Sequence, residues 1–287
     1  MRRTRPERRG PPSRASSGPR GAPPRGTRIV PGFVTDDELR EVLDWLGTIR
    51  PLWEHRFSTR RPPPPGETQR MLQRPVYWLG SWQFACLGYY HPPRGAVNRC
   101  VRAEPFPPVL ARWVERIERF ARAELPPAVI PDGWTLDTCL VNYYGDRIVD
   151  GRRDDRARVG AHRDFEPGPV GSVSIGDRAM FQFVDRTGSV VEQTWLEDRS
   201  LQLFAGPVHK DQLLHRVQRV DRKHGPLPLP LDGFVTRRVN FTFRWVPPSA
   251  VVDYAALPDE LRSDVRDSVE ALAAHAPFWA AAAAGSP

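Results

Sequence analysis

The segment RRVNFTFRWV, residues 237–246, has two faces of opposite chemical character. Side chains of a β-strand point alternately to the two sides of a sheet. One face of this segment is apolar throughout and consists of Val239, Phe241, Phe243 and Trp245. The other face is polar and consists of Arg238, Asn240, Thr242 and Arg244. A planar guanidinium group matches the two oxygens of a carboxylate. The segment therefore predicts a strand that presents a carboxylate-binding face to the inside of a barrel, with an exposed surface strand as the alternative.

Short alternating segments surround this strand between residues 134 and 247. Glycine, proline and aspartate separate them, which is typical of antiparallel β proteins. We expect strands in TLDTCLVNYY, GSVSIGD, AMFQFVD, VVEQTWLE and SLQLFAG. The predicted fold class is α+β: a mainly-β double-stranded β-helix, or jelly roll, with flanking N-terminal helices and a C-terminal helix.

The spacing of apolar residues predicts the flanking helices. Thr35 and Glu38 match a capping box, and apolar residues follow at helical spacing. A second apolar stripe lies in PPVLARWVERIERFARAEL, after prolines that suit a helix start. A third runs from Leu257 to Leu272, and we expect the alanine run near the C-terminus to be a frayed end.

The net charge of +8 is concentrated at one end of the chain. Residues 1–26 contain eight arginines and one glutamate among proline, glycine and serine, and the remainder is close to neutral. The segment is predicted to be a disordered basic arm, either a plain solvated tail or a tether for polyanions. Three cysteines without CxxC spacing favour a reducing compartment. With no apolar run of membrane-spanning length, we expect a soluble, cytoplasmic monomer without a membrane partner.

The tripeptide HRD at residues 162–164 is compatible with two kinds of enzyme. In protein kinases it opens the motif H-R-D-L-x-x-x-N, whose asparagine binds magnesium. Pro169 occupies that position here. A kinase also needs a lysine before the motif, whereas both lysines of this chain, Lys210 and Lys223, come after it. The kinase interpretation is therefore excluded.

A metal site is the other interpretation of this tripeptide. In a strand, His162 and Asp164 would project to the same side and could share a metal ion. Non-haem Fe(II) oxygenases hold iron with two histidines and one carboxylate, so a further histidine from another strand is required. His209 and His215 are the candidates. The other histidines have no motif around them: His55, His91, His224 and His275.

Together these features resemble the AlkB family of Fe(II)- and 2-oxoglutarate-dependent dioxygenases. The resemblance rests on the order of His162-x-Asp164, a later histidine and Arg-x-Asn-x-x-x-Arg, and it covers about residues 28–247. It selects His215, in LLHRVQRV, over His209 as the third Fe(II) ligand. It implies O2 as one cosubstrate and 2-oxoglutarate as the other. The residues implied to bind 2-oxoglutarate are Asn142, Tyr144, Arg238, Asn240 and Arg244, with Arg238 at the distal carboxylate and Arg244 near the chelating end.

The resemblance also implies a reaction and a substrate. Oxidative decarboxylation of 2-oxoglutarate gives succinate and CO2, while a methyl group on a nitrogen of a DNA or RNA base is hydroxylated and lost as formaldehyde. The segment LGSWQFACLGYYHP is similar to the nucleotide-recognition lid of the family. Candidate substrate contacts are Trp82, Tyr89, Tyr90 and Glu166. Trp82 could stack on a base or pack in the core, and Glu166 is one methylene longer than the aspartate of the bacterial DNA-repair type.

Two further functions stay open beside nucleic-acid demethylation. One is the same oxidative chemistry on a protein or other non-nucleic-acid substrate, and the other is a non-catalytic binding module on the same fold. The expected organisation has three parts: a basic arm at 1–26, an AlkB-like dioxygenase domain at 27–248 and a helical extension at 249–287. Within the domain we expect the lid at about 70–100 and the jelly-roll core at about 134–247.

Overall fold

A computed structural model describes residues 26–56, 70–71, 74–83, 100–156, 158–220 and 225–285. Its centre is strand β16 (Phe234–Arg244), which contains most of the segment that predicted the barrel. On one side β16 pairs antiparallel with β7 (Thr138–Val149), and on the other with β10 (Val170–Gly176). The predicted strand is confirmed, and its position between two neighbours explains why it has no solvated edge.

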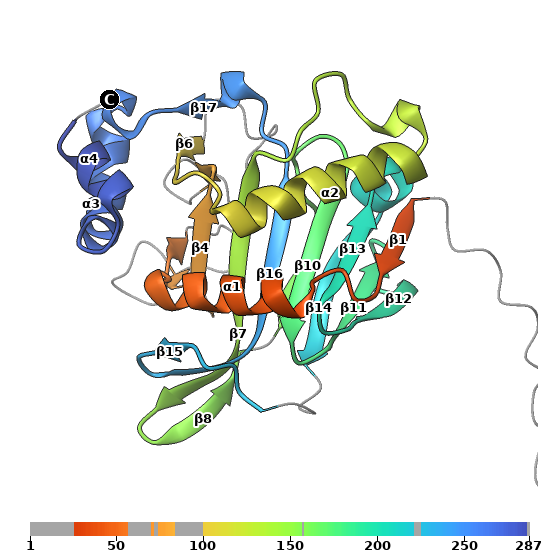
Figure 1. The fold of residues 1–287 in the computed structure, drawn as a ribbon, viewed down its shortest axis with the longest axis horizontal. Helices are drawn as coiled ribbons and strands as arrows, with labels where there is room; N and C mark the ends of the chain where they lie inside the picture. Colours follow the sequence, from red (N-terminus) through yellow and green to blue (C-terminus); the bar gives the residue numbers. More distant parts are fainter. Residues whose placement is uncertain are drawn as a thin grey trace, which may run out of the picture.

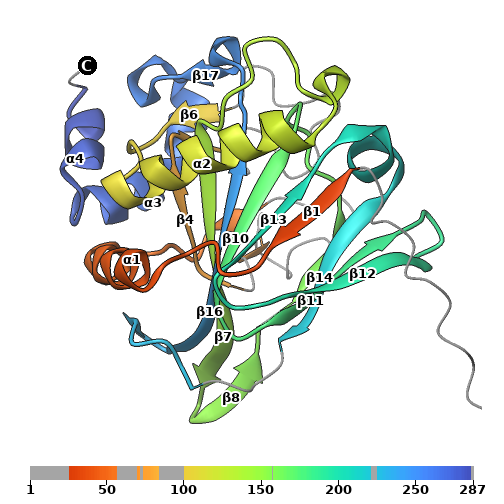
Figure 2. The same ribbon diagram turned by 45° about the vertical axis from the view of Figure 1, so that its right-hand side comes forward.

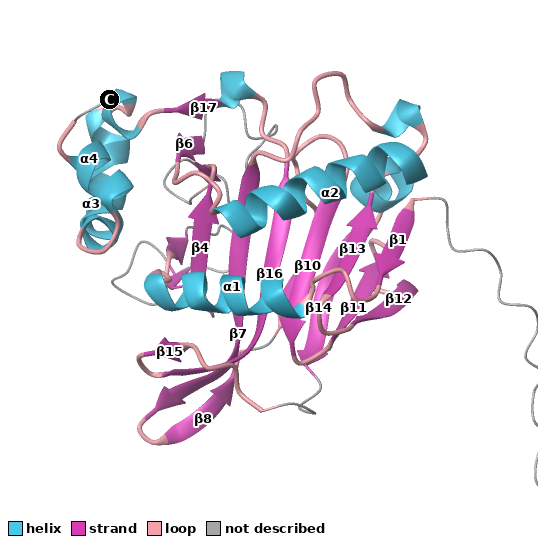
Figure 3. Ribbon diagram, viewed as in Figure 1, coloured by secondary structure: helices cyan, strands magenta, loops and turns pink. Residues whose placement is uncertain are grey.

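Two sheets make up the β core (Figure 1, Figure 3). The larger has the strand order β1-β13-β10-β16-β7-β4, with β15 paired to β16 and β8 paired to β7. The bounds of its other strands are β1 (Thr27–Val30), β4 (Val76–Leu79), β8 (Arg152–Asp155), β13 (Ser200–Phe204) and β15 (Pro230–Leu231). The smaller has the order β12-β11-β14-β9. Its strands are β9 (Val159–His162), β11 (Ala179–Val184), β12 (Val190–Leu196) and β14 (Leu214–Val220).

Short strands and turns complete the described chain. The remaining strands are β2 (His55–Arg56), β3 (Arg70–Met71), β5 (Ser81–Trp82), β6 (Cys100–Arg102) and β17 (Val251–Val252). The 3-10 turns are η2 (Pro127–Val129), η4 (Pro248–Ala250) and η5 (Tyr254–Ala256), and η3 (Val208–Gln212) is a single π-helical turn.

Two helices cover the outer face of the larger sheet. In Figure 1 α1 (Asp36–Thr48) and α2 (Pro108–Glu124) both cross in front of its strands. The predicted capping box at the start of α1 is present, since Thr35 and Glu38 satisfy each other's backbone N–H groups. Trp113 of α2 meets Phe241 of β16 edge to face, with ring centroids 5.3 Å apart. The apolar face of β16 therefore forms the core beneath the helices.

A second apolar cluster joins the two sheets. The larger sheet contributes Tyr144, Val170 and Phe204 to it, and the smaller contributes Phe181 and Phe183 among others. Figure 2 shows the strands of the smaller sheet diverging behind the larger one. Two antiparallel sheets with an interior between them confirm the predicted jelly roll.

The C-terminal region contains two helices where the sequence predicted one. They are α3 (Asp259–Ala273) and α4 (Pro277–Ala283). The alanine run was predicted to be a frayed end, which is wrong because most of it belongs to α4. Trp279 anchors α4: its side chain is buried and meets Trp82 edge to face at 5.3 Å. None of the described helices has the length and apolar character that crossing a membrane requires. Nearly all of the predicted basic arm, residues 1–25, lies outside the described residues.

Candidate active site

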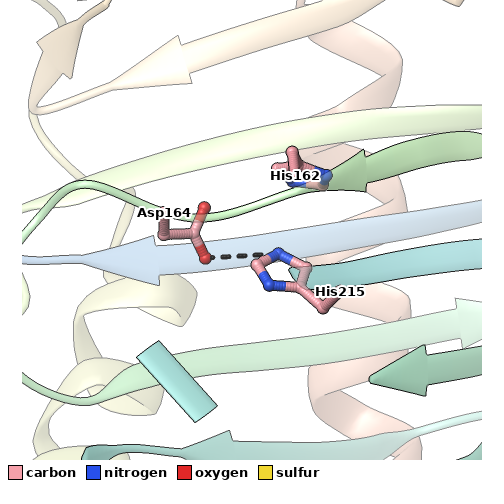
Figure 4. Close-up of side chains that lie close together, drawn as sticks. All are labelled: His162, Asp164 and His215. Carbon is pink, nitrogen blue, oxygen red and sulfur yellow. Dashed lines mark ion pairs between the residues drawn. The ribbon is translucent and has the colours of Figure 1, made fainter. Parts of the chain in front are cut away.

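Three side chains that could bind a metal meet between β9 and β14 (Figure 4). His162 is the last residue of β9, His215 lies near the start of β14, and the two are paired in register. Asp164 follows in the loop after β9, so the expectation that one strand carries both motif residues is wrong. A ligand atom from each of the three lies within 4.8 Å of the others. The loop turns Asp164 toward the histidines although it is not held by strand geometry.

Hydrogen bonds orient these three groups. Asp164 Oδ1 accepts a hydrogen bond from Arg244 Nε at 3.0 Å and forms an ion pair with Arg244 Nη2 at 2.8 Å. Asp164 Oδ2 has no hydrogen bond among the described residues and faces His215 Nε2 at 3.6 Å. His162 Nδ1 lies 2.8 Å from the carbonyl oxygen of Gly160. When Nδ1 donates that bond, the Nε2 lone pair is available to a metal ion. Each group thus keeps one ligand atom uncommitted.

The protonation states suit metal binding. Burial, together with the neighbouring His162, lowers the pKa of His215 to about 3. Burial also lowers the pKa of His162. Burial by itself would raise the pKa of Asp164, but Arg244 and His215 hold it well below its usual range. Neutral imidazoles and an ionised carboxylate are the forms that ligate metals. This donor set fits Fe(II), for which two histidines and one carboxylate form a facial triad.

The neighbouring residues show why the alternatives fail. Arg163 is exposed and points away from the cluster, where it donates a hydrogen bond to the carbonyl oxygen of Asp211. His209 lies outside the cluster, because its Nε2 is 3.1 Å from Glu192 Oε2 and its ring packs on Phe183. Of the other histidines, His275 is exposed on the C-terminal extension, while His55, His91 and His224 have no described side chains.

The inner face of β16 holds a buried cation with spare hydrogen-bond donors. Arg238 is fully buried, and its Nη2 donates to Ser174 Oγ at 2.8 Å. Its guanidinium carbon lies 4.8 Å from the centre of the Tyr144 ring. Nε and Nη1 have no hydrogen-bond partner within the described chain, and no described carboxylate pairs with this arginine. A buried charge without a counter-charge is unfavourable, so Arg238 fits the distal carboxylate of 2-oxoglutarate.

The two predicted asparagines are engaged by protein groups. The Asn240 amide nitrogen donates to Ser172 Oγ and to the Val173 carbonyl oxygen, each at 2.9 Å. Asn142 Oδ1 accepts from Arg74 Nε at 2.9 Å. Both asparagines lie opposite each other on β16 and β7. Both asparagines thus bind protein groups, whereas Arg238 keeps two nitrogens without a described hydrogen-bond partner.

Two buried residues near the site were missed by the sequence reasoning. Gln202 of β13 is fully buried beside Ser172, and neither of its amide atoms has a hydrogen-bond partner in the described part of the chain. Alternation along SLQLF could have indicated that it faces inward with Ser200 and Phe204. Lys210, in η3, is also buried, and its Nζ has no described partner. Its rarity was the available signal, because the chain contains two lysines among 42 basic residues.

The predicted substrate contacts differ in their burial and in whether the structure describes them. Trp82 is 2% exposed, donates its Nε1 hydrogen to Glu54 Oε1 at 2.6 Å and packs on Trp279. Its prediction as a base-stacking residue is therefore wrong, because α4 covers the ring. Tyr89 and Tyr90 lie outside the described residues. Glu166 is buried, with Oε2 3.7 Å from Arg244 Nε. Between Asp164 and Glu166, Phe165 is 44% exposed and provides an aromatic surface that the sequence reasoning overlooked.

Comparison with known proteins agrees with this chemistry. Residues 26–244 match the family model of the 2OG-Fe(II) oxygenase superfamily. Among solved structures, OsALKBH1 is similar at 21% identity, over 77% of this chain and 98% of that chain, with a TM-score of 0.47. The Escherichia coli ribosomal oxygenase YcfD is similar at 12% identity, over 39% of this chain and 24% of that chain, with a TM-score of 0.24. Among curated proteins, none matches the chain.

Proposed function

The chain belongs to the 2OG-Fe(II) oxygenase superfamily, and from this premise we propose that it removes methyl groups oxidatively from nucleobases of DNA or RNA. As a member it is an enzyme that uses Fe(II), 2-oxoglutarate and O2. The motif order His-x-Asp, His, Arg-x-Asn-x-x-x-Arg, which resembles the AlkB family, supports the demethylase assignment. Products would be succinate, CO2 and formaldehyde.

The residues of the site fall into two groups, one that would bind the metal and one that would bind the cosubstrate. His162, Asp164 and His215 would hold Fe(II), while Arg238 would hold the distal carboxylate of 2-oxoglutarate. Bound iron and cosubstrate supply an oxidant through oxidative decarboxylation. Arg244 donates a hydrogen bond from Nε and pairs through Nη2 with one oxygen of Asp164, which leaves the other oxygen without a described hydrogen bond and available to the metal. This arrangement orients the carboxylate before any ligand arrives.

Two residues that follow Asp164 in the chain support a nucleobase as the substrate. Phe165, next to Asp164 in the chain, exposes 44% of its surface, and Glu166 places a buried carboxylate beside Arg244. Flat rings stack on aromatic side chains at about 1–3 kcal/mol per base, and polar edges of a flipped or single-stranded base need hydrogen-bonding groups in the pocket. The exposed ring of Phe165 would provide the stacking surface. Glu166 and Arg244 would provide the hydrogen-bonding groups.

The test is formaldehyde release from methylated single-stranded DNA and RNA oligonucleotides in the presence of Fe(II) and 2-oxoglutarate. We expect formaldehyde and succinate in equal amounts from at least one methylated base. His162→Ala should abolish both products because it removes a metal ligand. His275→Ala changes an exposed histidine outside the site and serves as the matched control. Succinate formation without formaldehyde from any oligonucleotide would assign the chemistry to a different substrate.

The N-terminal arginines are proposed to strengthen binding to nucleic acid. The charge of residues 1–26 is +7, whereas the remainder is nearly neutral. Each phosphate neutralised makes the logarithm of affinity fall more steeply with the logarithm of salt concentration. Deleting residues 1–26 should therefore flatten the salt dependence of oligonucleotide binding. An unchanged slope would show that the arm does not contact the phosphates.

A further inference from the structure

Lys210 is a buried cation that the site as described does not use. Its side chain is 9% exposed, and Nζ has no hydrogen-bond partner among the described residues. An unsatisfied buried donor is costly, and more so when it is charged. The chain elsewhere uses arginine almost exclusively, with two lysines among its 42 basic residues. A compact ammonium at this position therefore calls for an acceptor that the protein itself does not provide.

The packing of η3 places Lys210 at the metal cluster. Nζ lies 6.0 Å from the centre of the Phe204 ring, and His215 is one of the neighbours of that ring, at 5.3 Å between centroids, together with Phe181 and Phe183. The turn is closed by a hydrogen bond from the Leu213 N–H to the Val208 carbonyl oxygen. Arg163 joins the loop of Asp164 to the turn by donating to the Asp211 carbonyl oxygen. The loop of Asp164 is thus joined to the turn that carries Lys210.

Electrostatic effects agree with this position. The carboxylates of Asp164 and Glu166 raise the pKa of Lys210, although burial lowers it more. In turn, the Lys210 charge lowers the pKa of both Asp164 and His215. The ammonium therefore acts on the same small space as the metal ligands.

The charges around this space are already matched without Lys210. Arg244 donates to Asp164 at 3.0 Å, forms an ion pair with it at 2.8 Å and lies 3.7 Å from Glu166. Iron would add two positive charges and Arg238 one, so that with Arg244 four positive charges would face four negative ones, namely Asp164, Glu166 and the two carboxylates of 2-oxoglutarate. Lys210 would then be a surplus positive charge close to the metal ligands. A cationic target is disfavoured there, and a target with an accessible carbonyl oxygen is favoured.

We propose that Lys210 is a specificity-determining substrate contact that donates a hydrogen bond to a carbonyl oxygen of an uncharged methylated base. The proposal rests on the proposed nucleobase demethylation. Methylation of an amide-type ring nitrogen, as in 3-methylthymine, leaves the base neutral with two carbonyl groups. Methylation of a pyridine-type nitrogen, as in 3-methylcytosine, makes the base cationic. Lys210 would select the first class over the second.

The experiment compares two single-stranded oligonucleotides of one sequence that carry either 3-methylthymine or 3-methylcytosine. We expect wild-type kcat/KM, measured by formaldehyde release, to be at least about tenfold higher for 3-methylthymine. Lys210→Met should reduce this ratio about tenfold and leave the KM for 2-oxoglutarate unchanged. Val208→Ala alters an exposed side chain of the same turn and should keep the wild-type ratio. If Lys210→Met does not fold, Lys210→Gln, which retains a donor, replaces it and should give an intermediate ratio.

Several results would overturn the inference. A wild-type preference for 3-methylcytosine would contradict it and leave demethylation itself intact. The same ratio in Lys210→Met as in the wild type would also contradict it, and an accompanying rise in the KM for 2-oxoglutarate would assign Lys210 to the cosubstrate. If no methylated oligonucleotide releases formaldehyde, the proposed function fails and the inference fails with it.

Discussion

The two faces of strand β16 share one backbone and have opposite energetic roles. On the outer face Val239, Phe241 and Phe243 are fully buried and belong to the main apolar cluster. On the inner face Arg238 is equally buried, yet two of its three nitrogens have no hydrogen-bond partner in the described structure. Burial of apolar surface stabilises the fold, whereas burial of an incompletely paired charge opposes it. The outer face thus offsets the energetic cost of a ligand-binding inner face.

This comparison predicts that mutations on the two faces change different measurements. Substitutions on the outer face should lower the free energy of unfolding and leave cosubstrate binding unchanged. Substitutions on the inner face should weaken cosubstrate binding and leave the free energy of unfolding unchanged or raise it. The alternation along β16 makes these tests possible at neighbouring residues of one strand.

The largest effect is expected for Phe241→Ala on the outer face. Removing this buried ring, which packs on Trp113, should lower the free energy of unfolding by about 3–5 kcal/mol. Urea denaturation measures the change. Val191→Ala, at a residue that is 59% exposed on β12, should change stability by less than about 0.5 kcal/mol. A destabilisation below about 1 kcal/mol for Phe241→Ala would argue against a core beneath the helices.

Arg238→Met on the inner face is expected to have the next largest effect. It should lower kcat/KM for 2-oxoglutarate about 100-fold or more, because a buried charge pair with the cosubstrate is lost. Stability should stay the same or rise, since an incompletely paired charge is replaced by an apolar chain. Arg237→Met is the matched control: this arginine pairs with buried Asp177 at 2.8 Å, so its loss should lower stability and spare the KM. A large stability loss in Arg238→Met would assign that residue a structural role.

A smaller effect is expected for Trp82→Phe, which tests whether the distinction between core and site extends beyond β16. The change keeps an aromatic ring against Trp279, although a smaller one, and removes the N–H that donates to Glu54. The free energy of unfolding should fall by about 1 kcal/mol. The KM for a methylated oligonucleotide should not change. A clear rise in that KM at unchanged stability would indicate that Trp82 contacts the substrate after all.

The smallest effect concerns Asp137, where the chain enters β7. Its Oδ1 accepts from the Val246 N–H at 2.8 Å, just beyond the end of β16. Burial raises the pKa of this carboxyl to about 6 in the folded state. The folded protein therefore holds the proton more tightly than the unfolded chain, so the stabilisation is fully present below about pH 4 and is lost as pH rises through 6.

Thermal unfolding of Asp137→Asn beside the wild type isolates this contribution. The difference in Tm, wild type minus variant, should decrease between pH 4 and pH 7, because the amide does not ionise. A difference that is constant over this range would show that the carboxyl is not perturbed by folding.

Local patterns in the sequence predicted a large part of this protein. Alternation in RRVNFTFRWV predicted both faces of β16, and the capping pattern at Thr35 predicted the start of α1. The motif order predicted an iron and 2-oxoglutarate oxygenase, which the family match confirms at the level of the superfamily. These features depend on side chains within a few residues of one another or on the order of short motifs. Local patterns and motif order can both be identified from the amino-acid sequence without knowing which distant segments meet.

Only the tertiary structure decided which distant groups meet. The pairing of β9 with β14 brings His215 to His162, and the loop after β9 carries Asp164 within 3.6 Å of His215. Packing of α4 buries Trp82, and packing of the π-helical turn buries Lys210. None of these contacts leaves a periodic signal, because each joins segments far apart in the chain through strand pairing and core packing. The sequence by itself determined the kind of chemistry and the faces of the strands, and the fold determined which residues surround the substrate.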